Sequence, residues 1–290
     1  MTKYLGDKDA MARVSAGFSK RSHGILKGAI GAIDGWLVRI VRPGFRRDGI
    51  KNVTSFFSRK GFYALNVQCI VDDKKRVIWL SYKHKGGSHD SSCFSHTELH
   101  KHLHSIKDKL FSMGFYLLGD SAYALESFIL VPYDGPRPQS AEDDFNFYHS
   151  SARITVECAF GEIDLRWGIF WKRLKCSLEN AAIIIEGSMR LHNFLVDYRE
   201  SSKDIDKELD AILERHIFEQ ELDDSNVIPI VVGNQSGRGA GRPTFNEIQN
   251  RTLGLKMRDM LKNDLQDYGL HRPRASQWKD DSYSHVVRVE

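Results

Sequence analysis

The first half of the chain alternates between apolar and polar positions with the period of a β-strand. Residues 32–40, 61–71 and 77–82 are rich in β-branched, aromatic and aliphatic side chains, and an Asp-Asp-Lys-Lys turn separates the last two runs. This pattern predicts a meander of three antiparallel strands. Residues 1–28 are polar, with no clear period, and we expect a weakly ordered N-terminal lead there.

The period changes after the third strand. Apolar residues spaced three to five apart over 91–113 predict a helix. Short apolar runs at 115–118 and 128–131 predict two more buried strands. Residues 134–139 contain two prolines and a glycine, which indicates a loop.

Helical spacing returns from residue 150 and again over 180–198. Three antiparallel strands, a helix, two further strands and then helices predict an α/β fold, with a ribonuclease-H-like mixed sheet flanked by helices. We place this domain at residues 29–198. Residues 199–290 form a helical and linker-rich C-terminal tail, with an amphipathic stretch over 245–268.

Composition narrows the class of protein. The 290 residues are 41% hydrophobic and 28% charged, as in a globular protein. No apolar run approaches the roughly 18 residues of a membrane helix, and no secretory signal is visible at the N-terminus. The four cysteines lie far apart, so we expect reduced thiols and a reducing compartment, the nucleus or the cytoplasm.

Positive charge is concentrated in one segment. The net charge of +4 is too small to indicate a nucleic-acid partner, but residues 39–60 carry seven Lys or Arg and one acid. This segment either contacts a phosphate backbone or is an ordinary solvated face. The candidate DNA-binding residues are Arg46, Arg47, Lys51, Arg59 and Lys60. A Gly- and Arg-rich stretch at 233–243 is either a flexible linker or an AT-hook.

Three acidic residues stand in distinctive positions. Asp34 and Asp120 each stand at the end of a predicted strand, and Glu157 lies on a later helix. Singly, each has an ordinary explanation as a turn residue, a helix N-cap or an exposed helix acid. Three together, in a fold order that brings strand ends and a late helix close, predict one oxygen-lined site.

Such a site has a direct chemical use. Clustered carboxylates resist joint ionisation, and a divalent cation supplies the missing charge. Mg²⁺ and Mn²⁺ prefer oxygen ligands, and two such ions promote displacement at phosphorus. Asp90, in the turn after the third strand, is either a helix cap or a fourth metal ligand, and His89 beside it is a candidate for orienting a phosphate or a ligand.

Other chemistries have less support. The chain has no G-x-S-x-G motif, and no cysteine has a histidine in a helpful frame, which argues against a serine or cysteine hydrolase. His96, His100 and His104 are spaced four apart on a predicted helix. They are interpreted as surface histidines rather than a zinc face, because no Cys or acidic partner has matching spacing.

The motifs around these acids resemble one family over about residues 29–197. The matching frames are Gly31-Ala-Ile-Asp34-Gly35, Asn66-Val-Gln68, Gly87-Ser-His-Asp90-Ser91, Leu118-Gly-Asp120-Ser-Ala-Tyr123, Arg153 through Val156-Glu157, Phe160-Gly161 and Leu191-His192-Asn193. The chain resembles the catalytic domain of the PIF/Harbinger transposases and their nuclease relatives, a DDE superfamily.

The resemblance implies a function and a site. Asp34, Asp120 and Glu157 would be the catalytic, metal-binding DDE triad, and Asp90 a further metal ligand. The expected activity is Mg²⁺- or Mn²⁺-dependent endonucleolytic cleavage of DNA, with strand transfer as a further step. The alternative is a catalytically silent DNA- or protein-binding module. Expected partners are DNA, a Myb-like DNA-binding protein and a second copy of the chain, in the nucleus.

Overall fold

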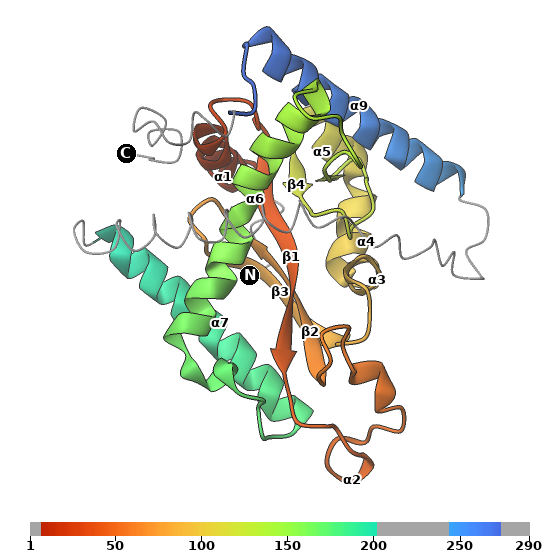
Figure 1. Cartoon of the computed structure of the whole chain (residues 1–290), viewed down its shortest axis with the longest axis vertical. Helices are drawn as coiled ribbons and strands as arrows, with labels where there is room; N and C mark the ends of the chain where they lie inside the picture. Colours follow the sequence, from red (N-terminus) through yellow and green to blue (C-terminus); the bar gives the residue numbers. More distant parts are fainter. Residues whose placement is uncertain (1–6, 202–243, 274–290) are drawn as a thin grey trace.

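A five-stranded mixed sheet forms the centre of the computed structural model, which describes residues 7–201 and 244–273. The strand order is β3-β2-β1-β4-β5 (Figure 1). The strands are β1 (Ala29–Arg39), β2 (Ala64–Val71), β3 (Val77–Lys85), β4 (Tyr116–Leu118) and β5 (Ile129–Leu130). The first three pair antiparallel, whereas β4 and β5 run parallel to β1. This ribonuclease-H-like α/β arrangement confirms the prediction from sequence.

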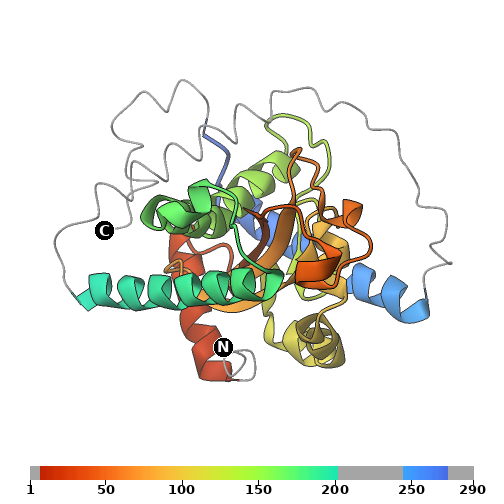
Figure 2. The same ribbon diagram turned by 90° about the horizontal axis from the view of Figure 1, so that it is seen from below.

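Helices cover both faces of the sheet. Neighbouring residues of β4 show the alternation, because Tyr116 and Leu118 join one apolar cluster and Leu117 joins the other. The first cluster lies under α6 (Ala141–Arg166) and α7 (Leu178–Ser201), and the second under α3 (Asp90–Ser95), α4 (Glu98–Ser105) and α5 (Lys107–Met113). Figure 2 shows α6 and the α3–α5 group on opposite sides of the sheet. Shorter connecting helices are α2 (Phe45–Asp48), η2 (Thr54–Phe56) and η3 (Gly168–Trp171).

Helix boundaries depart from the apolar pattern where caps intervene. The single helix predicted over 91–113 is three helices, since Thr97 caps α4 by accepting a hydrogen bond from the His100 N–H. Helix α6 starts at residue 141 rather than 150. Ser140 caps it, and the acidic residues of its first turn interact favourably with the positive end of the helix dipole.

The prediction of a weakly ordered lead is wrong for most of its length. Residues Lys8–Arg21 form helix α1, with the side chain of Asp7 accepting hydrogen bonds from the backbone of its first turn. Met11, Val14 and Phe18 are buried on one side of it. The stripe is narrow and interspersed with Lys and Ser, so its period is weak in the sequence.

Helix α9 (Phe245–Asp267) confirms the amphipathic stretch predicted near the C-terminus. Thr244 and Glu247 form a capping box at its start. The helix packs against α6 and β5, across the top of the view in Figure 1. The proposed domain boundaries stay predictions, and the Gly- and Arg-rich stretch at 233–243 lies outside the described residues.

Two further expectations concern cysteines and membranes. Cys69, Cys93 and Cys158 are buried, and Cys176 is half-buried. Among the described helices, none has the length and apolar character needed to span a lipid bilayer.

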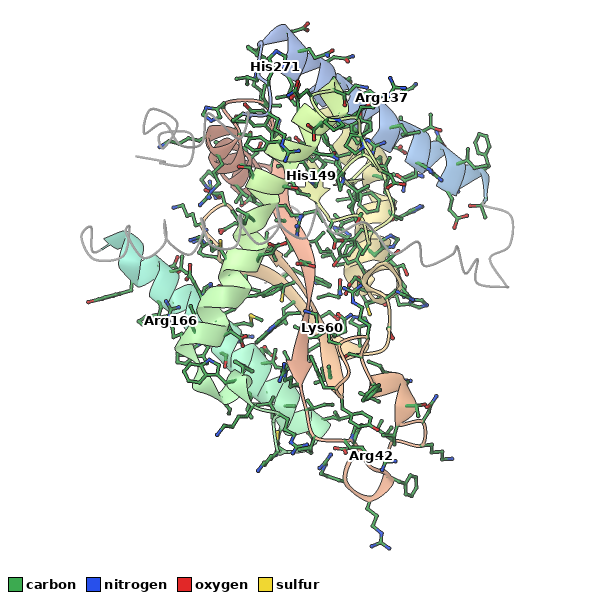
Figure 3. The ribbon with its side chains drawn as sticks, viewed as in Figure 1. Arg42, Lys60, Arg137, His149, Arg166 and His271 are labelled. Atoms are coloured by element: carbon green, nitrogen blue, oxygen red, sulfur yellow. The ribbon has the colours of Figure 1, made fainter. Side chains whose placement is uncertain are left out.

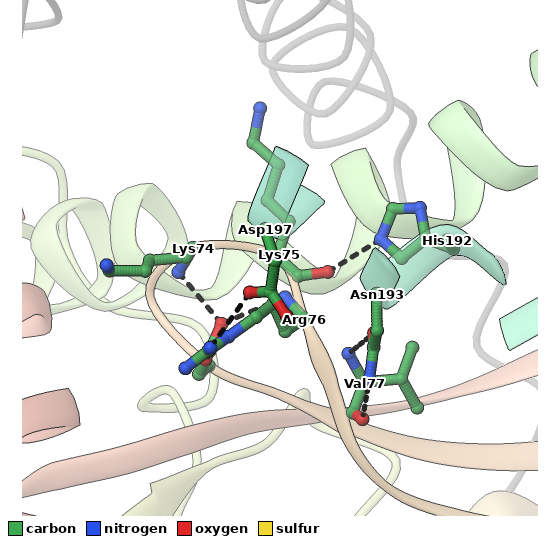
Figure 4. A network of polar contacts seen from close by, with 8 residues as sticks. Lys74, Lys75, Arg76, Val77, His192, Asn193 and Asp197 are labelled. Atoms are coloured by element: carbon green, nitrogen blue, oxygen red, sulfur yellow. Dashed lines mark hydrogen bonds and ion pairs between the residues drawn. The ribbon is translucent and has the colours of Figure 1, made fainter. Parts of the chain in front are cut away.

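The His192-Asn193 pair ties α7 to the turn between β2 and β3 (Figure 4). The His192 ring lies 2.8 Å from the Lys75 carbonyl oxygen, through Nε2. Asn193 accepts from the Val77 N–H and donates to the Val77 carbonyl, both at 2.8 Å. The pair is therefore a specific polar clamp on the edge of the sheet.

Candidate active site

The parallel pairing of β1 with β4 brings two of the predicted acids side by side. Ala32 is the register partner of Leu118. Asp34 lies within β1 rather than at a strand end as predicted, and Asp120 lies two residues beyond the end of β4. The parallel register nevertheless places the two acids at the same level of the sheet. Acids placed 86 residues apart in the chain therefore meet because of strand register.

Three of the four predicted acids line one cavity of about 850 Å³. Asp34 comes from β1, Asp90 from the first turn of α3 and Glu157 from the middle of α6. Ala122, two residues after Asp120, lines the cavity as well. Three predicted acids from β1, α3 and α6 therefore share one opening, and Asp120 belongs to the turn after β4 that also contributes Ala122.

The clustered carboxylates raise one another's pKa values. The pKa of Asp34 is raised from 3.8 to about 7, mainly by burial and also by repulsion from Asp120 and Glu157, against the opposing effect of Arg153. The pKa of Asp120 is also raised, first by burial and then by Asp90 and Glu157. The cluster therefore carries more negative charge than its surroundings stabilise, as expected of a cation-binding site.

Arg153 supplies one positive charge at the centre of this cluster. Its Nη1 lies 2.6 Å from Glu157 Oε1, one helical turn away on α6, and 3.8 Å from Asp34 Oδ2. The Arg153 side chain is only 9% exposed. Sequence reasoning placed Arg153 in a family motif but gave it no role. Its spacing of four from Glu157 on a helix was the available signal.

A buried amide network holds Asp90. Asn66 and Gln68 each donate to Asp90 Oδ1 at 2.8 Å, and the Tyr123 hydroxyl donates to Gln68 Oε1 at 2.6 Å. Gln68 is fully buried. A Cβ at Gly35 would overlap Asp90 Oδ1, so the glycine lets this carboxylate approach β1. The sequence signal for the network was two amides spaced by two within a buried strand.

The structure decides the capping alternatives for two acids. Asp90 is not the N-cap of α3, because His89 occupies that position and Asp90 binds the amides of β2 instead. Asp120 accepts a hydrogen bond from the Ala122 N–H in a turn, with no helix following directly. Neither carboxylate is accounted for as a helix cap.

The predicted basic residues divide into two groups. Arg59 and Lys60 are exposed and line the cavity that contains Asp34 and Glu157; Lys60 is labelled in Figure 3. Arg46, Arg47 and Lys51 are exposed on and after α2 and are not among the lining residues. Arg47 pairs with Asp48 at 2.9 Å.

The histidines at 96, 100 and 104 do not share one environment. The His100 ring lies 2.9 Å from Glu126, a partner from the loop before β5, and is 17% exposed. His96 is exposed, with its ring 2.6 Å from the Ser92 carbonyl oxygen. Interpretation as three surface histidines is therefore wrong for His100, whose acidic partner comes from a distant part of the chain.

The acids carry the type of donor atom that a hard divalent cation prefers, but their side chains are not arranged around a common ion. Carboxylate oxygens are the donors that Mg²⁺ and Mn²⁺ prefer. Within residues 7–201 and 244–273, no three Asp, Glu, His or Cys side chains are placed to hold one ion as they stand. One reason is that Arg153 engages an oxygen of Glu157.

Residues 33–193 match the DDE superfamily endonuclease family, more than half of the chain. The chain belongs to this family. The matched region contains Asp34, Asp90, Asp120 and Glu157, together with the His192-Asn193 clamp, and excludes α1 and α9. The resemblance inferred from the sequence motifs is confirmed.

Two curated proteins with low sequence identity to this chain support its membership of the family. The chain is 25% identical over 155 residues to "Protein ALP1-like" of Arabidopsis thaliana, covering 49% of this chain and 37% of that protein. It is 26% identical over 180 residues to "Putative nuclease HARBI1" of Rattus norvegicus, covering 60% and 47%. The chain thus spans less than half the length of these relatives. No solved structure matches it.

Proposed function

We propose that this chain is a divalent-metal-dependent DNA endonuclease. One observation carries the proposal: three carboxylates from separate elements line a single cavity and a fourth, that of Asp120, interacts with them electrostatically, in a chain of the DDE superfamily endonuclease family. Asp34, Asp120 and Glu157 would hold Mg²⁺ or Mn²⁺, with Asp90 as a further ligand. The bound metal would supply the charge that activates an attacking oxygen and stabilises the leaving oxygen at phosphorus.

The chain's own residues account for the rest of the reaction. Burial around Asp34 strengthens every charge interaction at the site. Arg59 and Lys60, exposed on the rim of the cavity, would contact the phosphate backbone. Water adds to phosphorus and the P–O3′ bond breaks, which leaves a 3′-hydroxyl and a 5′-phosphate. Attack by that 3′-hydroxyl on a second strand would extend the same chemistry to strand transfer.

Nicking of supercoiled plasmid tests this proposal. We expect relaxation of the plasmid with Mn²⁺ or Mg²⁺ and its loss with EDTA. Asp34→Asn, Asp120→Asn and Glu157→Gln should each abolish nicking while keeping the fold, as followed by circular dichroism. Glu98→Gln is the matched control, because Glu98 is an exposed acid that pairs with Lys101 on α4. Normal nicking by a folded Asp120→Asn protein would refute the triad.

A silent DNA- or protein-binding module is the second candidate. The observation in its favour is that the acids are not arranged as ligands among the described residues, and that Arg153 already binds Glu157. Calorimetric titration with Mn²⁺ separates the two functions. An enzyme should show a site that Asp34→Ala abolishes, and a silent module should show none. Nuclear localisation, a Myb-like partner and pairing of two copies stay predictions.

A further inference from the structure

Arg153 occupies the position where a cation is most needed in this molecule. Its guanidinium contacts Glu157 at 2.6 Å and lies 3.8 Å from Asp34, with the side chain almost completely buried. A buried charge is retained only when it is paired, and here its partners are proposed metal ligands. The contact with Glu157 occupies one of the two carboxylate oxygens that could bind a metal ion.

The influence of Arg153 extends beyond the residue it touches most closely. It is the strongest charge opposing the rise in pKa at both Asp34 and Asp120. One guanidinium therefore stabilises three carboxylates that belong to different elements. A divalent cation among the same carboxylates would repel the guanidinium, because two positive charges a few ångströms apart in a poorly solvated site interact strongly.

We propose that Arg153 is an internal counter-ion that holds the acid cluster together without metal and must release Glu157 when metal binds. This inference rests on the proposed function, because it assumes that the acids bind a divalent cation. Arg153 is a positioning residue in this scheme. It stabilises the metal-free fold and weakens metal affinity, two effects that a purely structural arginine would not combine.

The first experiment measures Mn²⁺ affinity by calorimetry and the melting temperature of the full chain, with and without Mn²⁺. Arg153→Gln keeps much of the side-chain length and removes the charge. We expect a lower melting temperature without metal, a Mn²⁺ dissociation constant at least about tenfold lower than wild type, and a larger metal-induced rise in melting temperature. Arg153→Lys keeps the charge and should bind Mn²⁺ close to the wild-type affinity.

Arg166→Gln is the matched control. Arg166 lies on the same helix (labelled in Figure 3) and pairs with Glu162 four residues before it, at 3.9 Å. The substitution removes one positive charge and one ion pair of the same spacing, away from the acid cluster. It should lower the melting temperature without changing the Mn²⁺ dissociation constant by more than about twofold.

The outcomes separate this inference from the proposed function. If wild type binds no Mn²⁺, the proposed function fails. If wild type binds Mn²⁺ and Arg153→Gln binds it equally or more weakly, the counter-ion inference alone fails, because the arginine then only supports the fold. If Arg153→Gln does not fold, nuclear magnetic resonance of wild type labelled with ¹⁵N-arginine decides. The side-chain Nε–H signal that is absent in Arg153→Lys should shift on Mg²⁺ saturation, and an unchanged signal would overturn the inference.

Discussion

Burial and like charge act together on Asp34, so its protonation should govern stability over a defined pH range. Its pKa is about 7 in the folded chain, against an ordinary value of 3.8. Between these values the folded state binds more protons than the unfolded state, so stability falls as pH rises from about 4 to 7. Below this range both states are protonated, and above it the penalty is constant.

Asp34→Asn should therefore stabilise the metal-free protein at alkaline pH. We expect a gain of up to about 4 kcal/mol in the free energy of unfolding at pH 8, shrinking towards zero near pH 4. Urea unfolding in EDTA at both pH values measures it. A gain that is the same at both values would contradict the electrostatic explanation.

The amide network that binds Asp90 predicts which of two substitutions lowers the free energy of unfolding more. Gln68→Leu leaves Asp90, Asn66 and the Tyr123 hydroxyl each short of a partner, and should lower the free energy of unfolding by about 2–4 kcal/mol. Tyr123→Phe removes one hydrogen bond and should lower it by about 1–2 kcal/mol. Denaturant titrations test the order, and equal losses would show that the network does not act through Gln68.

At the scale of elements, replacement of a helical glycine by alanine should have opposite effects on stability in α9 and in α7. A Cβ at Gly254 of α9 would lie 2.6 Å from the Glu126 carbonyl oxygen, whereas one at Gly187 of α7 would meet nothing within 4 Å. Gly254→Ala should destabilise the chain by about 1–3 kcal/mol through overpacking. Gly187→Ala should stabilise it by about 0.5–1 kcal/mol through helix propensity. Thermal or urea unfolding of both variants checks the signs.

The close approach at Gly254 is part of a wider contact between α9 and the loop that follows Asp120. Asn250 accepts from the Ser127 N–H at 3.0 Å and donates to Glu126 at 2.7 Å, and Glu126 also binds His100. The loop is thereby held from two sides. If Gly254→Ala lifts α9, plasmid nicking should fall with stability, and unchanged nicking in a destabilised variant would show that α9 supports the fold alone.

Sequence patterns predicted elements better than they predicted contacts. The strands and α9 follow from alternation and helical spacing that local sequence determines. Helix α1 was missed because three buried apolar residues among polar ones give a weak period. The partners of Arg153 and Gln68 depend on which elements the fold places together, and no local pattern encodes that. The sequence motifs identified the acids. The neighbouring groups that shift their pKa values are visible only in the folded structure.

For the whole molecule, the distribution of positive charge predicts the salt dependence of DNA binding. Arg59 and Lys60 border the cavity, whereas Arg47 is already paired with Asp48. Arg59→Gln and Lys60→Gln should each reduce the slope of log affinity against log salt by about 1, uniformly across sequences. Arg47→Gln should reduce it less.

Fluorescence anisotropy of a labelled duplex in EDTA, at several salt concentrations, measures these slopes. Without metal, binding is separated from cleavage. Equal slopes for all three variants would mean that DNA does not approach the cavity along the rim that carries Arg59 and Lys60.

Because the acids meet through the register of β1 and β4, the cluster depends on the exact number of residues that precede Asp34 in β1. Inserting one amino acid between Gly31 and Asp34 would turn that carboxylate to the opposite face of the pleat, toward apolar neighbours such as Ile70. Insertions of this kind in surface turns would leave the chemistry untouched. Descendants of such a gene are therefore free to vary widely in their loops, while a frame-preserving codon gained in this short stretch would silence them at once.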